Sequence, residues 1–406
     1  MEVKPRPWTA LKVIFVSQML ISFVPAIGPV LAADMAPRLG VNADRIGVFS
    51  ALTYLWAIVG GVLVGPWIGW IGPVRAVQIM LLAAALGAWL AALGNLTGVL
   101  LAAVALGASL SFPHPAFTAI LGRHAPRQSI GLFISLRFSA APIGIALAGV
   151  LVPAAVNTLG ERWTIAAAGM ACALAAFSVG RTVKALDWRD ALRPTRIDLT
   201  SAVRHVWAHP GLVRLALVCM VFAMVQQAFL AYAVLLLVSL GLPLPTSAGL
   251  LAISQIVAVI GRIVMGHASD RWVTPRAMLC VYGLGMGVAC IALARLPASP
   301  GMPLVATVMA LIAVTAMGWP GMMAAQLLRL SLASQVATNS SGSQVFIFSG
   351  AVVGPYLIAI ALGWGAGYEW AFMGLGVLAI LAGLSMLTPG ARLTDKPHCA
   401  DQTDRP

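Results

Sequence analysis

Charged residues are scarce in this sequence, making up 9% of it, and only 12 of the 406 residues are acidic. A soluble domain carries about 25% charged residues, so the shortage argues against a soluble domain as the main part of the chain. Apolar residues reach 60% instead. The composition therefore predicts an integral membrane protein.

Cysteine is also rare, and its spacing suggests no site. Cys172, Cys219, Cys280 and Cys290 lie inside apolar segments and Cys399 lies in the C-terminal tail. These spacings match neither a disulfide framework nor a metal site. The sequence also has no phosphate-binding P-loop and no nucleophile with a matching base, so we predict no cofactor, no ATP drive and no enzyme.

The net charge of +13 is spread between apolar segments rather than gathered in one patch, which favours membrane orientation over nucleic-acid binding. Apolar runs of roughly 20 residues recur along nearly the whole chain, and roughly twelve membrane-spanning helices fit. They are expected near residues 9–33, 46–69, 76–93, 98–121, 130–153, 163–180, 211–238, 246–268, 277–294, 303–328, 340–363 and 368–387.

Residues 181–210 are rich in arginine and helix breakers, and we interpret them as a cytoplasmic linker. They divide the chain into an N-terminal bundle of six helices (1–180) and a C-terminal bundle of six helices (211–388), with a polar tail at 389–406. Placing both termini inside leaves only four loop arginines outside, namely Arg38, Arg45, Arg162 and Arg295. The first apolar run lacks a cleavage site, so we expect a retained helix and a multi-pass protein of the inner (plasma) membrane.

The two halves of the chain show an internal sequence repeat. The turn from Gly65 to Arg75 aligns with that from Gly266 to Arg276, and Pro113 aligns with Pro320. Two copies of a six-helix unit explain these matches, and such duplication is typical of membrane transporters.

The chain resembles the major facilitator superfamily over nearly its whole length. The likeness rests on two motifs. The turn motif is formed by Gly266, Asp270, Arg271 and Arg276, and the helix-packing motif is formed by Gly350, Gly354 and Pro355. In the first half, Pro142 corresponds to Pro355. The resemblance implies an all-α fold of two pseudo-symmetric bundles that rock about a central site, with the turn motif as a conformational latch. Gly69 stands where the family has an aspartate, and the fourth helix lacks the arginine typical of proton-driven drug antiporters.

One cation interrupts the apolar runs in the first half. Arg137 and His114 each lie about eight residues from the polar turn at 122–129, or roughly 10 to 12 Å into the hydrocarbon. Arg137 shares a stripe of small residues with Ala141, Gly144 and Ala148, which favours an interior face. Two alternatives stay open: Arg137 reaches back to the headgroups, and His114 only satisfies the backbone near Pro113 and Pro115.

Polar and aromatic residues at mid-depth complete the candidate site. Together with Arg137 and His114, the predicted substrate-binding residues are Tyr54, Gln226, Gln227, Gln255, Trp319, Gln344 and Ser349. Some of them are expected to be contacts between helices. Tyr356, like Trp319, is a further candidate for stacking.

All acidic residues lie at helix ends, loops or tails, so no carboxylate is placed to neutralise Arg137. A guanidinium binds a carboxylate in a bidentate manner, which predicts a small organic anion as substrate. Anion import against a negative-inside potential requires coupling, either to a proton, with His114 as a possible carrier, or to a counter-anion. Export of hydrophobic or amphipathic compounds is the alternative. We expect a monomer whose only other partner is the lipid bilayer.

Overall fold

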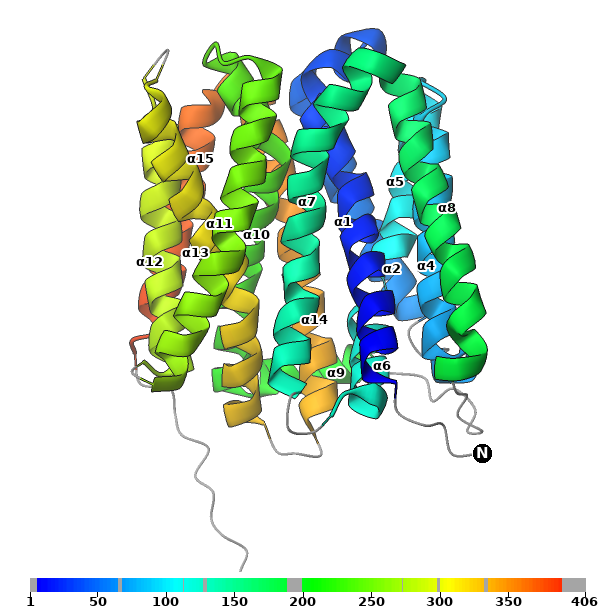
Figure 1. The fold of residues 1–406 in the computed structure, drawn as a ribbon. Helices are drawn as coiled ribbons and strands as arrows, with labels where there is room; N and C mark the ends of the chain where they lie inside the picture. Colours follow the sequence, from blue (N-terminus) through cyan, green and yellow to red (C-terminus); the bar gives the residue numbers. More distant parts are fainter. Residues whose placement is uncertain are drawn as a thin grey trace, which may run out of the picture.

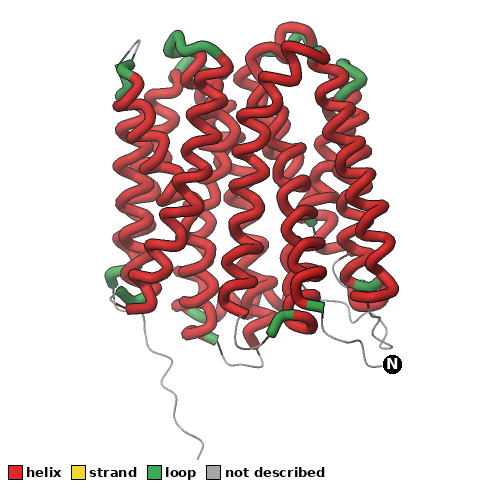
Figure 2. The backbone as a smooth tube through the Cα atoms, viewed as in Figure 1, coloured by secondary structure: helices red, strands yellow, loops and turns green. Residues whose placement is uncertain are grey.

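The computed structural model describes residues 6–64, 68–111, 113–126, 130–187, 199–271, 273–297, 300–331 and 335–388. Within these ranges the chain is helical apart from short turns and loops, and it contains no strand (Figure 2). Ten helices in this part of the chain are long and apolar enough to cross a membrane. The predicted all-α membrane fold of two six-helix bundles is confirmed.

The N-terminal bundle contains the first six spans. Its elements are α1 (Pro7–Arg38), η1 (Ala43–Arg45), α2 (Ile46–Val64), α3 (Ile68–Ile71), α4 (Pro73–Ala91), α5 (Leu96–Leu110), α6 (Pro113–His124), α7 (Ile130–Leu159) and α8 (Glu161–Leu186). The fourth span is split into α5 and α6, and α6 begins at Pro113. Because proline lacks a backbone N–H, it fits the first turn of α6 better than the middle of a continuous helix.

The C-terminal bundle contains the other six spans. Its elements are α10 (Pro210–Ser239), α11 (Leu244–Arg271), α12 (Pro275–Ala294), α13 (Met302–Leu330), α14 (Val336–Gly363) and α15 (Gly367–Ser385). Figure 1 shows the two bundles side by side, with α7 and α14 near the boundary between them. Across that boundary α7 packs on α11 and α2 packs on α14, as expected for two halves related by a pseudo-twofold axis.

Residues 181–210, which we interpreted as a linker, contain more helix than their composition predicts. Helix α8 continues to Leu186, and α9 spans Leu199–Ala208 at the lower end of the bundle in Figure 1. The ring of Trp207 stacks on that of Phe346 in α14, with centroids 5.6 Å apart. A helix of this length is marginal alone, so packing on α14 accounts for its presence.

Glycines allow α14 to lie against α10. A Cβ atom added to Gly350 would fall 2.1 Å from the main-chain oxygen of Met220, and one added to Gly354 would fall 2.2 Å from that of Met224. Any larger residue would force the two helices apart. The glycines of the packing motif therefore lie within the C-terminal bundle, while Pro355 lies at the boundary, beside Gly47 of α2.

The small stripe of α7 faces the interior of its own bundle. Ala148 is fully buried, and a Cβ on Gly144 would meet the main-chain oxygen of Met19 in α1. On the other side of the helix, Val150 and Leu151 are exposed. Gly144 and Ala148 therefore pack inside the N-terminal bundle, with Gly144 against α1.

The two ends of the bundle differ in charge. We call the end at which α1 begins the basic end; Arg123, Arg181, Arg204, Arg276 and Arg329 lie there. We call the other end the opposite end; it holds Arg38, Arg45, Arg162 and Arg295. At the opposite end, Arg38 pairs with Glu161 and Arg295 pairs with Glu369.

Candidate functional site

Arg137 of α7 is buried inside the protein. Its side chain lies about two helical turns from the start of α7 at Ile130, which is roughly 10 Å from the basic end. Arg137 is 5% exposed, and its guanidinium carbon lies 5.0 Å from the ring centre of Phe138 and 5.5 Å from that of Phe117 in α6. The side chain therefore lies among aromatic rings and does not extend to the protein surface.

A second arginine at a similar depth, Arg262 of α11, is absent from the sequence-based predictions. It lies about two and a half turns before the end of α11 at Arg271. Its Nη1 donates to the main-chain oxygen of Phe138 at 2.5 Å, and its Nη2 donates to that of Met317 in α13. Arg262 thus connects α7 of one bundle with α11 and α13 of the other.

The same depth count that singled out Arg137 would have found Arg262. Both arginines interrupt a long apolar run, but Arg262 lies close in sequence to the turn motif at 266–276. An intramembrane arginine is costly and usually faces a bundle interior or an aqueous path. The structure places one such residue in each bundle.

Both guanidinium groups lie near the ring of Phe138. The guanidinium carbon of Arg262 lies 5.9 Å from its centroid, so the two arginines are near neighbours. Two like charges no more than about 11 Å apart repel by at least about 1.5 kcal/mol at an effective dielectric constant of about 20. An anion bound nearby would reduce this repulsion.

Two of the predicted polar residues meet across the boundary between the bundles. Tyr54 of α2 interacts with the side chain of Gln227 in α10. The ring of Tyr54 also lies 6.4 Å from that of Phe348 in α14. These residues form a polar contact between the bundles near α2 and α14.

Gln226 and Trp319 lie in the interior of the C-terminal bundle. The amide of Gln226 donates to the Met317 sulfur at 3.0 Å. Trp319 is 2% exposed and packs edge-on against Phe222, at 6.3 Å between centroids. The Nε1 atom of Trp319 is buried and has no hydrogen-bond partner among the described residues. Both residues contact other side chains of the C-terminal bundle, and their role as substrate contacts stays a prediction.

Gln255 of α11 has a different environment. It is fully buried, and neither its amide nitrogen nor its amide oxygen has a hydrogen-bond partner among the residues that the structure describes. An unsatisfied buried polar group costs about 1–3 kcal/mol. Such a group is a candidate contact for a polar ligand.

The other predicted residues contribute less. Ser349 of α14 bonds the oxygen of Val345 in its own helix, Gln344 is partly buried, and Tyr356 is 47% exposed. His114 belongs to α6, but its side chain lies outside the described part of the structure. The side chains of the turn-motif residues Asp270 and Arg271 also lie outside the described part, and Gly266 belongs to α11.

Arg276, the last residue of the turn motif, is described, and it bonds within its own bundle. Its guanidinium donates to the main-chain oxygens of Met386 and Thr388, at the end of α15. These bonds tie α12 to α15 rather than one bundle to the other. The corresponding arginine of the first half, Arg75, lies 3.8 Å from Asp187 at the end of α8.

A hydrogen-bonded cluster joins the bundles at the opposite end. The Tyr232 hydroxyl of α10 donates to the main-chain oxygen of Asp44 at 2.5 Å and accepts from the amide of Gly47 at 3.1 Å. The Tyr368 hydroxyl of α15 donates to the Asp44 carboxylate at 2.9 Å. This cluster closes the opposite end between η1 and α2 on one side and α10 and α15 on the other.

Substituting Tyr368→Phe is expected to open the opposite end in more molecules. The change removes a hydrogen bond to a carboxylate, worth about 1.5–3 kcal/mol, which shifts the closed-to-open ratio by about tenfold to a hundredfold. Spin labels attached at Asn157→Cys and Ser239→Cys, with Cys399→Ser, would report the distance between the bundles. We expect a longer distance population. Tyr356→Phe, at an exposed tyrosine of α14, is the matched control. An unchanged distance distribution in Tyr368→Phe would refute this role.

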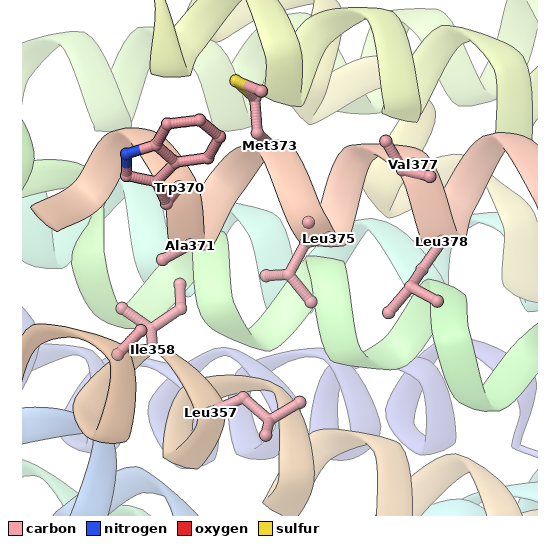
Figure 3. Close-up of a pocket in the computed structure, with 10 residues that line it drawn as sticks. Leu357, Ile358, Trp370, Ala371, Met373, Leu375, Val377 and Leu378 are labelled. Carbon is pink, nitrogen blue, oxygen red and sulfur yellow. The ribbon is translucent and has the colours of Figure 1, made fainter. Parts of the chain in front are cut away.

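A groove on the outer surface is a poor candidate site. It has a volume of about 530 Å³ and is lined by α14 and α15, with Leu357, Ile358, Trp370 and Val377 among its residues. Figure 3 shows apolar side chains from the two helices facing the groove, and Trp370 and Val377 are exposed. A surface of this kind suits lipid chains rather than a charged ligand.

Known proteins of the same fold are transporters. The structure resembles a POT family transporter in complex with 5-aminolevulinic acid, with a TM-score of 0.76, 13% identity, and coverage of 96% of this chain and 97% of that chain. It also resembles a D-xylose-proton symporter (TM-score 0.71, 15% identity, coverage 95% and 99%). A third similar structure is an inward-facing, unoccupied bacterial homolog of the human lysosomal transporter Spinster (TM-score 0.70, 14% identity, coverage 94% and 95%). At these identities the likeness shows the fold alone.

Sequence comparison gives the family. No curated protein matches the sequence. Residues 13–355, however, match the model of the Major Facilitator Superfamily, which confirms the resemblance carried by the turn and packing motifs. The chain therefore belongs to the Major Facilitator Superfamily and is a multi-pass membrane protein that acts as a secondary transporter.

Proposed function

We propose that this transporter moves a small organic anion of the carboxylate type by alternating access, with Arg137 as the anchor for the negative charge. The observation that carries the proposal is the burial of this guanidinium at 5% exposure, roughly 10 Å from the basic end. A buried arginine binds a carboxylate with two parallel hydrogen bonds, which supply both charge and orientation. The depth and the burial argue against snorkelling to the headgroups.

The proposal also includes the orientation of the protein in its membrane and the coupling of transport. Both termini and the basic end face the cytoplasm, the protein lies in the inner membrane, and it works as a monomer. Residues 181–210 link the two bundles, and Gly266, Asp270, Arg271 and Arg276 latch one conformation. Importing a monoanion costs about 2.3 kcal/mol per 100 mV. Proton cotransport, with His114 as carrier, or exchange for an internal anion meets this cost.

Uptake by purified protein in proteoliposomes tests the proposal. A panel of radiolabelled carboxylates is offered under imposed pH and voltage gradients. We expect accumulation of at least one carboxylate, competed by other carboxylates and not by neutral analogues such as their amides. If no carboxylate is taken up while hydrophobic or amphipathic cations are moved, the protein is an exporter of such compounds and the anion proposal fails.

A further inference from the structure

Arg137 and Arg262 place two positive charges, one from each bundle, beside one aromatic ring. Their guanidinium carbons lie 5.0 and 5.9 Å from the Phe138 ring centre. The two groups are therefore no farther apart than these two distances combined. A ligand that meets both charges would therefore contact both bundles beside Phe138.

The hydrogen bonds of Arg262 leave its positive charge without an anionic partner among the described residues. Nη1 and Nη2 bond neutral main-chain oxygens of Phe138 and Met317, which do not cancel the charge. The Nε atom is buried and has no hydrogen-bond partner among the described residues. A charged guanidinium in this state gains more from an anionic acceptor than from carbonyl oxygens alone.

The sequence offers no acidic side chain at this depth. Along α7 there is no aspartate or glutamate, and along α11 the sole one is Asp270, next to the helix end at Arg271. A monoanion would balance one of the two fixed positive charges, whereas a dianion would balance both. Charge balance therefore favours a ligand with two negative groups.

Gln255 adds a second polar side chain to the face of α11 that carries Arg262. It precedes Arg262 by about two helical turns and so lies on the same side of the helix. On that side a Cβ on Gly149 of α7 would meet Ala248 and Ala252, so this face of α11 packs on α7. The unsatisfied amide of Gln255 and the unsatisfied Nε of Arg262 both belong to this interface.

We propose that the substrate is a small dicarboxylate, one carboxylate of which binds Arg137 and the other Arg262. This inference rests on the proposed function and narrows its substrate class. Because the arginines belong to different bundles, the dianion bridges the two halves of the carrier. Arg262 is then a specificity-determining residue that distinguishes dicarboxylates from monocarboxylates.

Equilibrium binding of succinate and butyrate to the purified transporter tests this inference, because the two acids share a four-carbon chain and differ in one carboxylate. The wild type is expected to bind succinate about tenfold to a hundredfold more tightly, the range for one additional charge-assisted contact. Arg262→Gln should remove this preference by weakening succinate alone. Arg262→Lys, which keeps the charge, should retain part of it.

The outcomes separate this inference from the proposed function. Equal affinity of the wild type for both acids, or an equal loss of both in Arg262→Gln, would overturn the dicarboxylate assignment and leave the anion transporter standing. Binding of neither acid, nor of any other carboxylate, would overturn both. Arg181→Gln, an exposed arginine over the Phe177 ring at 4.4 Å, is the matched control and should change neither affinity. If Arg262→Gln does not fold, the wild-type preference decides alone.

Discussion

Replacing Arg137 by glutamine is expected to reduce carboxylate uptake at least a hundredfold. The variant keeps a hydrogen-bonding amide but loses the positive charge and the bidentate fork. Hydrogen bonds to charged groups contribute about 1.5–3 kcal/mol each, and two of them account for a loss of a hundredfold or more. Initial rates of uptake into proteoliposomes measure the effect. The thermal-denaturation midpoint of the variant in detergent, measured beside that of the wild type, separates loss of binding from loss of folding.

Arg181→Gln controls for the loss of an arginine beside a phenylalanine. Arg181 is exposed near the end of α8, with its guanidinium carbon 4.4 Å from the Phe177 ring centre. Its replacement should leave uptake unchanged. Normal carboxylate uptake by Arg137→Gln would show that Arg137 does not bind the substrate.

Gly354→Ala is expected to destabilise the C-terminal bundle by several kcal/mol. The added methyl group would fall 2.2 Å from the main-chain oxygen of Met224 and 2.6 Å from its Cα atom. Both atoms belong to the backbone of α10, so no side chain can rotate away and the helices must separate. The midpoint of thermal denaturation in detergent should fall by many degrees. Because Pro355 lies beside Gly47 across the boundary, displacement of α14 should also weaken closure of the opposite end.

Gly374→Ala provides the matched comparison. Gly374 lies in α15, and a Cβ atom there would meet nothing within 4 Å. Alanine is favoured over glycine within a helix by about 0.5–1 kcal/mol, so this variant should be unchanged or slightly more stable. Equal midpoints for the two variants would contradict the close packing of α14 on α10.

Much of the fold follows from the sequence because hydrophobic length and charge are local properties. The spans predicted at 211–238 and 277–294 agree with α10 and α12 to within a few residues. The start of α6 at Pro113 fits the preference of proline for the first turn of a helix. Proline alone does not predict a break, because Pro142 and Pro355 lie inside continuous helices. Helix α9 was not predictable, because its stability depends on packing against α14.

The site was less predictable, because its contacts join residues that are distant in sequence. The charge of Arg137 within an apolar run predicts its burial, and the same reasoning applies to Arg262. That the two arginines meet beside Phe138 follows only from the packing of α7 on α11. The bond between Asp44 and Tyr368 joins residues 324 positions apart and has no local signal. The burial of Trp319, at 2% exposure, likewise depends on packing within the C-terminal bundle and has no local signal.

Comparing a carboxylic acid with its own methyl ester tests the central claim most directly. The two molecules have nearly the same shape, and only the acid carries a negative charge. The account predicts that the purified wild-type protein binds succinate and that dimethyl succinate binds at least a hundredfold more weakly. If the ester binds as tightly as the acid, the buried arginines do not recognise the charge of the substrate, and the account is wrong.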